Sequence, residues 1–526
     1  MLKQSLTSVT RLDCIRALWC EVLALAPECV QTDSHFLLLG GDSLQLARLL
    51  ERVRATTGVS LGLHDLVRFA TPARMAACCD DATSAEDQTL AAAATGEMPV
   101  ACAPGVVPAT LVQQGIWLAE QLAAPQTLYL SSVLLHLHGR LDLRALQIAI
   151  NAVLLRHPAL CARLFPDSET RRLLFDTTGA AGAAALAVLR AEDCAPAELH
   201  PLVAQALRQP LSLQQGPLFR LRLFRLAATQ HVLLLACHHT ISDGWSGGIL
   251  LASLAESYAA ALAPGVLEYP PADWRFVAYC RRESLREATY EEWLPGWRYR
   301  LAGMHGALDW LWQDRVTGLW PHTVQSVRST VPAKLLAGLR RCAQQWQFSV
   351  FILFLHAVRY GLYACSGEAR QLLLVPVAQR LLDEESSIGC FIQPLLLVAR
   401  FDPAISLREA LLQDAAAFKA TQQAPIPLAA MAAMLRPRPL PDGNPWTSIL
   451  FAFQSYPHPK PQWPGLQHHV EAVADSASQY ALRLEVSCSE STWQLQVQYA
   501  TTLLDQSRIS ALLATIMARL QQLAEA

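Results

Sequence analysis

Residues 238–244 read His-His-Thr-Ile-Ser-Asp-Gly, and this heptad directly follows an apolar run over 231–237. The run is typical of a buried strand, so polar side chains emerge where the strand ends, a usual place for functional groups. On an extended chain, adjacent side chains point to opposite faces, so His239 can face a channel while His238 faces the interior. A lone histidine is more often structural, but two histidines, Asp243 and Gly244 at this spacing are a specific pattern. The heptad is therefore a candidate active site.

Strand and helix patterns alternate around the heptad. We predict strands at 128–137, 219–226, 231–237, 371–377, 446–454, 480–487 and 493–499. We predict helices at 142–156 (with Asp142 as cap), 247–262, 332–347, 349–365 and 505–523. A segment rich in Trp and Arg at 274–300 divides these elements into two groups. The elements after this segment resemble in content those before it. This order predicts two similar α/β halves.

The first eighty residues have a different, helical pattern. Apolar residues at helical spacing fill 12–25, and a second stripe in 43–56 contains Leu46, Leu49, Leu50 and Val53. Short helices at 61–69 and 72–79 complete a predicted four-helix unit. Residues 80–108 are rich in Ala, Thr, Gly, Glu and Pro without periodicity, which indicates a linker.

Composition narrows the function classes. The 526 residues carry a formal net charge of -2, so no basic excess points to nucleic acid. Mean hydropathy is +0.23, yet no apolar run reaches bilayer length, and the N-terminus does not lead into a signal-peptide segment. The 14 cysteines contain no Cys-x-x-Cys pair, which argues against a zinc site. We expect a cytoplasmic protein that binds no membrane, nucleic acid or metal.

Gly40-Gly41-Asp42-Ser43 introduces the second helix of the N-terminal unit. The glycines permit a tight bend, and the N–H groups at a helix start favour a phosphate ester on the Ser43 hydroxyl. Taken alone, the four residues also fit an ordinary helix cap. The longer stretch from Asp33 to Leu44 resembles the attachment site of peptidyl carrier proteins, over residues 8–80. That resemblance implies a covalent 4′-phosphopantetheine on Ser43, installed by a phosphopantetheinyl transferase, whose thiol holds an acyl group as a thioester.

The heptad resembles the condensation-domain signature His-His-x-x-x-Asp-Gly of nonribosomal peptide synthetases. Further motifs of that family are matched from about residue 107 onward, with departures: Gly115 stands for the usual arginine, Pro158 for an acid and Gln393 for asparagine. The chain is thus identified as a synthetase fragment, with a carrier (8–80), a linker (81–106) and a condensation domain in two halves (107–275 and 276–526). The implied fold is multidomain: a small four-helix carrier, then an α/β pseudo-dimer of two chloramphenicol-acetyltransferase-like sandwiches.

The condensation-domain resemblance also implies residue roles. His239 is the catalytic histidine, His238 is structural, and Asp243 forms a buried ion pair with an arginine of the second half, for which Arg380 is the best candidate. Two roles for His239 stay open: general base for the nucleophile, or positioning of an already neutral amine with stabilisation of the oxyanion by the Gly244 N–H.

The implied activity is transfer of a carrier-bound acyl group to an amine, which forms an amide. Ester formation, release onto a free small amine or alcohol, and a non-catalytic docking scaffold are alternatives. Heterocyclisation and epimerisation fit the heptad less well. No adenylation domain is visible, so we expect an upstream adenylation domain or loading enzyme, and a downstream carrier or a small amine or alcohol as acceptor.

Overall fold

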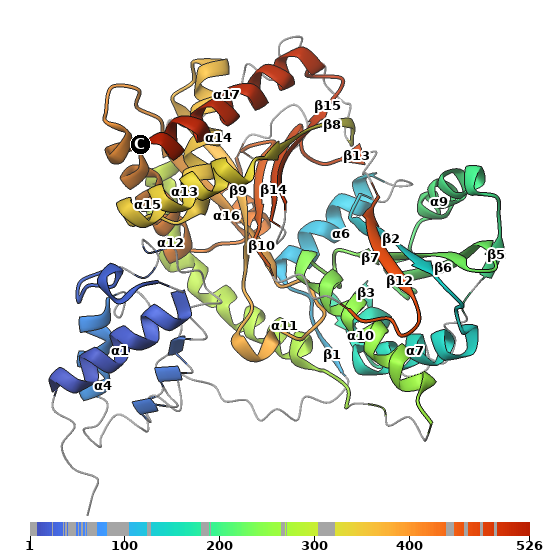
Figure 1. Cartoon of the computed structure of the whole chain (residues 1–526). Coiled ribbons are helices and arrows are strands. Elements are labelled where there is room, and N and C mark those ends of the chain that lie inside the picture. Colours follow the sequence, from blue (N-terminus) through green and yellow to red (C-terminus); the bar gives the residue numbers. More distant parts are fainter. Residues whose placement is uncertain are drawn as a thin grey trace, which may run out of the picture.

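The computed structural model describes residues 8–23, 25–34, 36, 39, 49–50, 52–53, 56–57, 59, 71–81, 105–123, 128–179, 189, 191–264, 269, 271–302, 304, 321–437, 446–456, 461–473, 477–488 and 492–526. They form a small N-terminal helical region and two α/β halves (Figure 1). Ser43 and the helix predicted at 61–69 lie outside the described residues, as does most of the helix predicted at 43–56.

The N-terminal region packs α1 (Ser8–Leu23) against α4 (Pro72–Asp81), with a short turn η1 (Pro27–Cys29) after α1. Trp19 is fully buried on α1 and meets the Phe36 ring edge-on at 5.0 Å between centroids. Leu49 and Val53 of the predicted second stripe are also fully buried in this core. The apolar stripes read from the sequence therefore close one small core of their own.

The first half is built on a five-stranded sheet. Its strand order is β12 (Gln467–Ala472), β2 (Leu130–His138), β7 (Gln230–His238), β6 (Phe219–Ala227) and β5 (Ala191–Asp193). Helices α7 (Leu143–Arg156) and α10 (Gly244–Leu262) pack on one face, and α9 (Leu199–Arg208) packs on the other. Apolar contacts on both faces explain why β7 is buried from His231 to His238. The strands and the two helices predicted in this half are confirmed, and α10 begins three residues earlier than expected, at Gly244.

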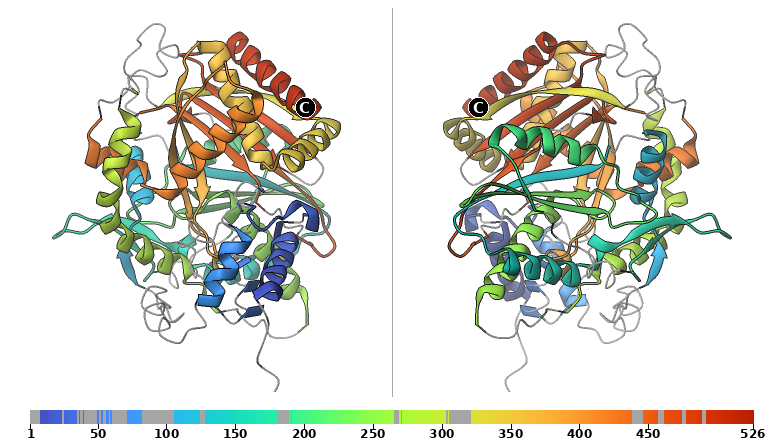
Figure 2. Two further views of the ribbon diagram at one scale, coloured as in Figure 1. Left: turned by 90° about the vertical axis from the view of Figure 1, so that its left-hand side faces the viewer. Right: turned by 90° about the vertical axis from the view of Figure 1, so that its right-hand side faces the viewer.

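The second half is built on a seven-stranded sheet. Its order is β10 (Ile392–Arg400), β9 (Arg370–Ala378), β11 (Ile449–Gln454), β14 (Leu482–Cys488), β15 (Trp493–Ala500), β8 (His322–Val331) and β13 (Ala477–Ser478). One face packs against α13 (Ala333–Trp346), α14 (Val350–Ser366), α15 (Leu407–Gln423) and α17 (Gln506–Glu525). The other face meets α12 (Tyr290–Leu301) and α16 (Leu428–Leu435). Figure 2 shows the red helix α17 on the outside of this half. The predicted strands and helices of this half are confirmed, whereas β8, β10, α15 and α16 escaped the sequence patterns.

Several smaller elements complete the described chain. A three-stranded sheet has the order β1 (Val106–Pro108), β4 (Leu173–Asp176) and β3 (Arg163–Pro166), and α6 (Leu111–Ala123) follows β1. Short helical turns are η3 (Pro158–Cys161), η4 (Pro196–Glu198), η5 (Glu287–Thr289) and η7 (Leu382–Glu384). Among the described residues no single helix is long and apolar enough to cross a membrane; only α13 and α14 taken together, bent by 107°, meet that test.

Two connections join the halves. The Trp- and Arg-rich segment forms α11 (Arg275–Arg286) and α12. Phe276 of α11 meets the Phe391 ring of the second half edge-on, and Tyr279 packs against that ring at a tilt. The second connection is β12, which belongs to the second half by sequence but pairs antiparallel with β2 of the first, as Figure 1 shows. Each half therefore contributes to the packing of the other.

Candidate active site

His239 follows the last residue of β7 and is held by the neighbouring strand. Its backbone N–H donates to the Tyr129 carbonyl at 2.8 Å, and its Nδ1 lies 3.3 Å from the Ser242 carbonyl oxygen. A carbonyl can only accept, so Nδ1 carries the ring proton and Nε2 keeps a free lone pair. The sequence placed His239 at the end of a strand; the structure adds which nitrogen is free.

The environment keeps this ring neutral. Burial first, and then the neighbouring His238 and Arg483, lower the pKa of His239 to about 4. At neutral pH the ring is therefore an acceptor for a proton or a hydrogen bond, as both roles considered for it require.

His238 points to the other side of the strand and is completely buried. Its Nδ1 accepts from the Thr240 N–H at 3.2 Å and lies 2.9 Å from the Thr240 hydroxyl. This leaves the proton on Nε2, which lies 3.5 Å from Oε1 of Glu120 on α6. The same Glu120 oxygen accepts from the N–H groups of Leu128 and Tyr129, at 2.8 and 2.9 Å. Glu120 thus ties α6 to the heptad, a link that no motif in the sequence indicated.

Asp243 and Arg380 come together across the two halves. Nη2 of Arg380 donates to both carboxylate oxygens of Asp243, at 2.8 and 3.1 Å, and both side chains are nearly inaccessible. Asp243 also caps α10 by accepting from the Ser246 N–H at 2.9 Å, and it accepts from the Phe391 N–H at 3.2 Å. Arg380 Nη1 donates to two backbone carbonyls, those of Glu384 and Ser387. The carboxylate is thus fully engaged in structure.

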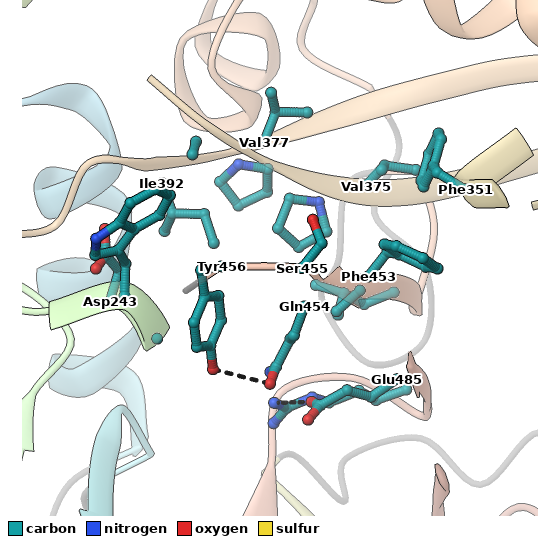
Figure 3. Close-up of a pocket in the computed structure, with 18 of the residues that line it drawn as sticks. Asp243, Phe351, Val375, Val377, Ile392, Phe453, Gln454, Ser455, Tyr456 and Glu485 are labelled. Carbon is teal, nitrogen blue, oxygen red and sulfur yellow. Dashed lines mark hydrogen bonds and ion pairs between the residues drawn. The ribbon is translucent and has the colours of Figure 1, made fainter. Parts of the chain in front are cut away.

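Gly244 is the first residue of α10 and lines the cavity, with the Tyr456 ring against its Cα. A Cβ at this position would come within 2.8 Å of Tyr456 Cε1 and Oη. The Tyr456 hydroxyl donates to Oε1 of Gln454 at 3.0 Å, which fixes the ring (Figure 3). Only a glycine therefore lets the start of the helix and this tyrosine approach so closely.

The cavity around His239 has a volume of about 1640 Å³ and is shared by the two halves. His239, Asp243 and Gly244 line it from the first half, and β9, β10, β11 and β14 line it from the second. Figure 3 shows Asp243 of the first half together with Val377, Ile392 and Glu485 of the second. Among the described residues of the N-terminal region, Leu25, Cys29 and Leu39 line the same space. Arg340, Lys419 and Arg436 also contribute to its walls.

These features suit a phosphopantetheine arm. The cavity offers one continuous space from the N-terminal region to His239, and its basic side chains suit the phosphate that such an arm carries. Ser43, the predicted attachment residue, lies outside the described residues. Within the described part of the chain, no group of His, Cys, Asp and Glu side chains is arranged to hold a metal ion.

Gln113 is a further residue of the site whose role was not predicted. It is fully buried on α6, and its Nε2 donates to the Thr240 carbonyl at 2.8 Å. Its Oε1 accepts from the Thr110 N–H at 2.9 Å. Gln113 therefore anchors the backbone of the heptad at Thr240, and the Thr110 N–H orients the Gln113 side chain.

Family models match nearly the whole chain. The condensation-domain model matches residues 103–526, and the model for a phosphopantetheine attachment site matches residues 13–79. The chain belongs to the condensation-domain family. Its N-terminal region is a phosphopantetheine carrier domain, so the chain contains two of the domain types of nonribosomal peptide synthetases.

Similar proteins include large synthetases. Malpibaldin synthetase of Mortierella alpina is 27% identical over 98% of this chain, and the dimodular nonribosomal peptide synthase of Bacillus subtilis is 27% identical over 89%. The chain spans 9% and 20% of the lengths of these two relatives.

Solved structures share the fold of the condensation domain. The first condensation domain of the calcium-dependent antibiotic synthetase has a TM-score of 0.64 at 20% identity, over 80% of this chain and 96% of that one. The X-domain from teicoplanin biosynthesis has a TM-score of 0.63 at 20% identity, over 80% and 96%. The fold predicted from the sequence, a small helical carrier followed by a two-part α/β condensation domain, is confirmed.

Proposed function

We propose that this chain transfers an acyl group from its carrier-bound thioester to an amine and so forms an amide bond. The observation that carries the proposal is a neutral His239, with Nε2 free, in a cavity that both halves and the carrier domain line. The phosphopantetheine arm, when bound, supplies the acyl group as a thioester, which is more open to amine attack than a carboxylate. The proposed carrier extends over residues 8–80 and is joined by a linker (81–106) to the condensation halves 107–275 and 276–526.

The residues divide the chemistry between them. His239 Nε2 accepts a hydrogen bond from the attacking amine. This bond directs the lone pair of the amine nitrogen at the carbonyl carbon. The Gly244 N–H, at the positive end of α10, stabilises the negative charge that develops on the carbonyl oxygen. As the C–N bond forms, the C–S bond breaks, and the proton released by the amine passes through His239 to the leaving sulfur. His238, Asp243 and Arg380 hold these groups in place.

The carrier proposal is tested by intact mass. Incubation with coenzyme A and a phosphopantetheinyl transferase should add one phosphopantetheine to the wild type and none to Ser43→Ala. A chain that gains no mass, or a Ser43→Ala variant that still gains it, would remove the carrier from the mechanism.

The catalytic proposal is tested by transfer from the loaded carrier to a panel of amines and alcohols. Loss of His239 should slow transfer by ~10²–10⁴-fold, the usual contribution of a general base or positioning histidine. His157→Asn, at a buried histidine that does not line the cavity, is the matched control. Equal rates for wild type and His239→Ala would instead favour a docking scaffold, and transfer to alcohols alone would favour ester formation.

A further inference from the structure

Two charged side chains lie on β14, an interior strand of the seven-stranded sheet between β11 and β15. Leu482, Leu484 and Val486 are fully buried against the helix-covered face. Successive side chains of a strand alternate, so Arg483 and Glu485 point to the opposite face, where they line the cavity. Removing charged side chains from water on an interior strand costs free energy, so we expect an interaction at this site that offsets the cost.

The charges continue as a row across the sheet. Arg483 and Glu485 pair through Nη2 and Oε2 at 2.5 Å. In the strand register, Glu485 is directly opposite Gln496 of β15, and Gln496 is directly opposite Arg328 of β8. Arg328 Nε donates to Gln496 Oε1 at 2.8 Å. All four residues line the cavity. We call them the charged row; it holds two guanidinium groups and one carboxylate, an excess of one positive charge.

The other end of the same sheet is chemically different. Val375 and Val377 of β9 and Ile392 of β10 also line the cavity, and all three are apolar (Figure 3). A substrate group that lies along β9 and β10 is therefore selected by shape, whereas one that lies along β14 meets hydrogen-bond donors and charge.

The β14 end of the charged row is tied to the reacting centre through β11. Glu485 pairs in register with Ala452, two residues before Gln454, and Gln454 binds the Tyr456 that lies against Gly244. Burial, then His238 and Arg483, lower the pKa of His239, so the guanidinium of Arg483 acts electrostatically on that ring. Glu485 and Arg483 both also act electrostatically on the partly buried phenol of Tyr456, beside Gly244; desolvation raises the pKa of this phenol. A substrate group held by Arg483 therefore lies at the end of the charged row that neighbours Gly244 and His239.

We propose that the charged row binds a carboxylate on one of the two substrates, so that this chain condenses an acidic building block. The inference rests on the proposed acyl transfer. A guanidinium can bind a carboxylate through two parallel hydrogen bonds, and the substrate carboxylate competes with Glu485 for Arg483. The acid can come with the acyl donor or with the amine acceptor, since both reach His239.

Binding of non-reactive, amide-linked pantetheine analogues to the full chain tests the proposal by calorimetry. The acceptor pair is aspartyl against asparaginyl, and the donor pair is succinyl against succinamoyl. In one pair the wild type should prefer the carboxylate by roughly tenfold, the size expected for a charge-assisted contact. Arg483→Gln should abolish that preference, and Arg508→Gln, at an exposed arginine on α17, should keep it. Equal affinities within both pairs, or a preference that survives Arg483→Gln, would overturn the proposal.

Two further variants separate recognition from folding. Arg328→Gln should weaken the carboxylate preference, whereas Glu485→Gln, which removes the competing carboxylate, should keep or increase it. Loss of the preference in Glu485→Gln at an unchanged unfolding midpoint would count against the proposal. The transfer assay stands apart: a wild type that binds the acid selectively but transfers nothing contradicts the proposed function and leaves the carboxylate subsite in place.

Discussion

At the residue scale, each polar group of the heptad has a different partner, and the partner decides what the group can do. His239 is left with a free Nε2 because Nδ1 donates to a backbone carbonyl, whereas both nitrogens of His238 face buried polar groups. Asp243 accepts from Arg380 and from two backbone N–H groups, so no lone pair is free for substrate. Chemistry and structure are thus divided among residues that are neighbours in the sequence.

We predict that Asp243→Ala lowers the free energy of unfolding, so a loss of activity in this variant does not by itself show a catalytic role. Removing the carboxylate leaves the Arg380 charge buried and unpaired, which costs about 3–5 kcal/mol. Chemical denaturation measures this loss. Asp193→Ala, at an exposed pair with Arg225, should cost less than about 1 kcal/mol. An Asp243→Ala protein of wild-type stability that has lost activity would show that the carboxylate acts in the reaction itself.

The lowered pKa of His239 predicts a flat pH profile. The folded ring stays neutral down to about pH 4, so the rate should not change between pH 8 and about 5 and should fall only below that. The measurement is kcat/KM for transfer to an aromatic amine, which itself stays neutral over this range. A rate that halves near pH 6.5, the usual value for histidine, would contradict the buried, neutral ring.

At the element scale, the start of α10 positions the site. Asp243 caps the helix, Gly244 opens it, and the Ser246 hydroxyl donates to Asp243 and lies 3.0 Å from the Gly389 carbonyl of the second half. One helix start therefore holds the proposed oxyanion donor, the anchor to Arg380 and the contact with the opposite half. A substitution in the first turn of α10 should therefore disturb the donor, the anchor and the contact together.

Gly244→Ala should lower kcat/KM about tenfold or more while it costs about 1–3 kcal/mol of stability. The added methyl group would lie 2.8 Å from the Tyr456 ring, which must leave its bond to Gln454. Gly247→Ala is the matched control on the same helix, because no atom lies within 4 Å of its added Cβ. Steady-state kinetics and thermal unfolding of both variants check the prediction; equal kinetics for the two would contradict it.

At the scale of the whole molecule, segments of each half pack against or pair with the other half. The strand β12 extends the sheet of the first half, Arg380 reaches Asp243, and α11 packs its aromatic rings against Phe391. The cavity is the space that these three contacts leave between the halves. Buried neutral histidines in both halves add a shared sensitivity to acid.

Stability should fall as the pH is lowered from about 6.5 towards 4. The pKa of His157 and of His239 is about 4 in the folded protein, and that of His356 is about 3, chiefly because burial disfavours the charged ring. In the unfolded chain each ring takes up a proton below about pH 6.5, so the unfolded state binds more protons over this window. The expected loss is about 1–3 kcal/mol per histidine.

Denaturation at pH 7 and pH 4.5 measures this acid sensitivity. His356→Gln should reduce the difference between the two pH values, and His200→Gln, at an exposed position on α9, should leave it unchanged. An unfolding free energy that is the same at both pH values in the wild type would contradict the prediction.

The sequence by itself determined the local features of this protein. Apolar periodicity predicted α1, α7, α14 and α17, and the heptad and the Gly-Gly-Asp-Ser turn indicated the domain types, because such patterns depend on neighbours a few residues away. It also suggested Arg380 as the partner of Asp243, through resemblance to a family.

Only the tertiary structure decided how distant segments meet at the site. Glu120 beside His238, Tyr456 over Gly244, and β12 in the other half's sheet all join residues far apart in the chain. The direction in which Arg483 points also became clear only when the alternation of β14 was seen against the helices on one face and the cavity on the other. Burial and cross-strand register are properties of the packed molecule, so no local pattern in the sequence contains them.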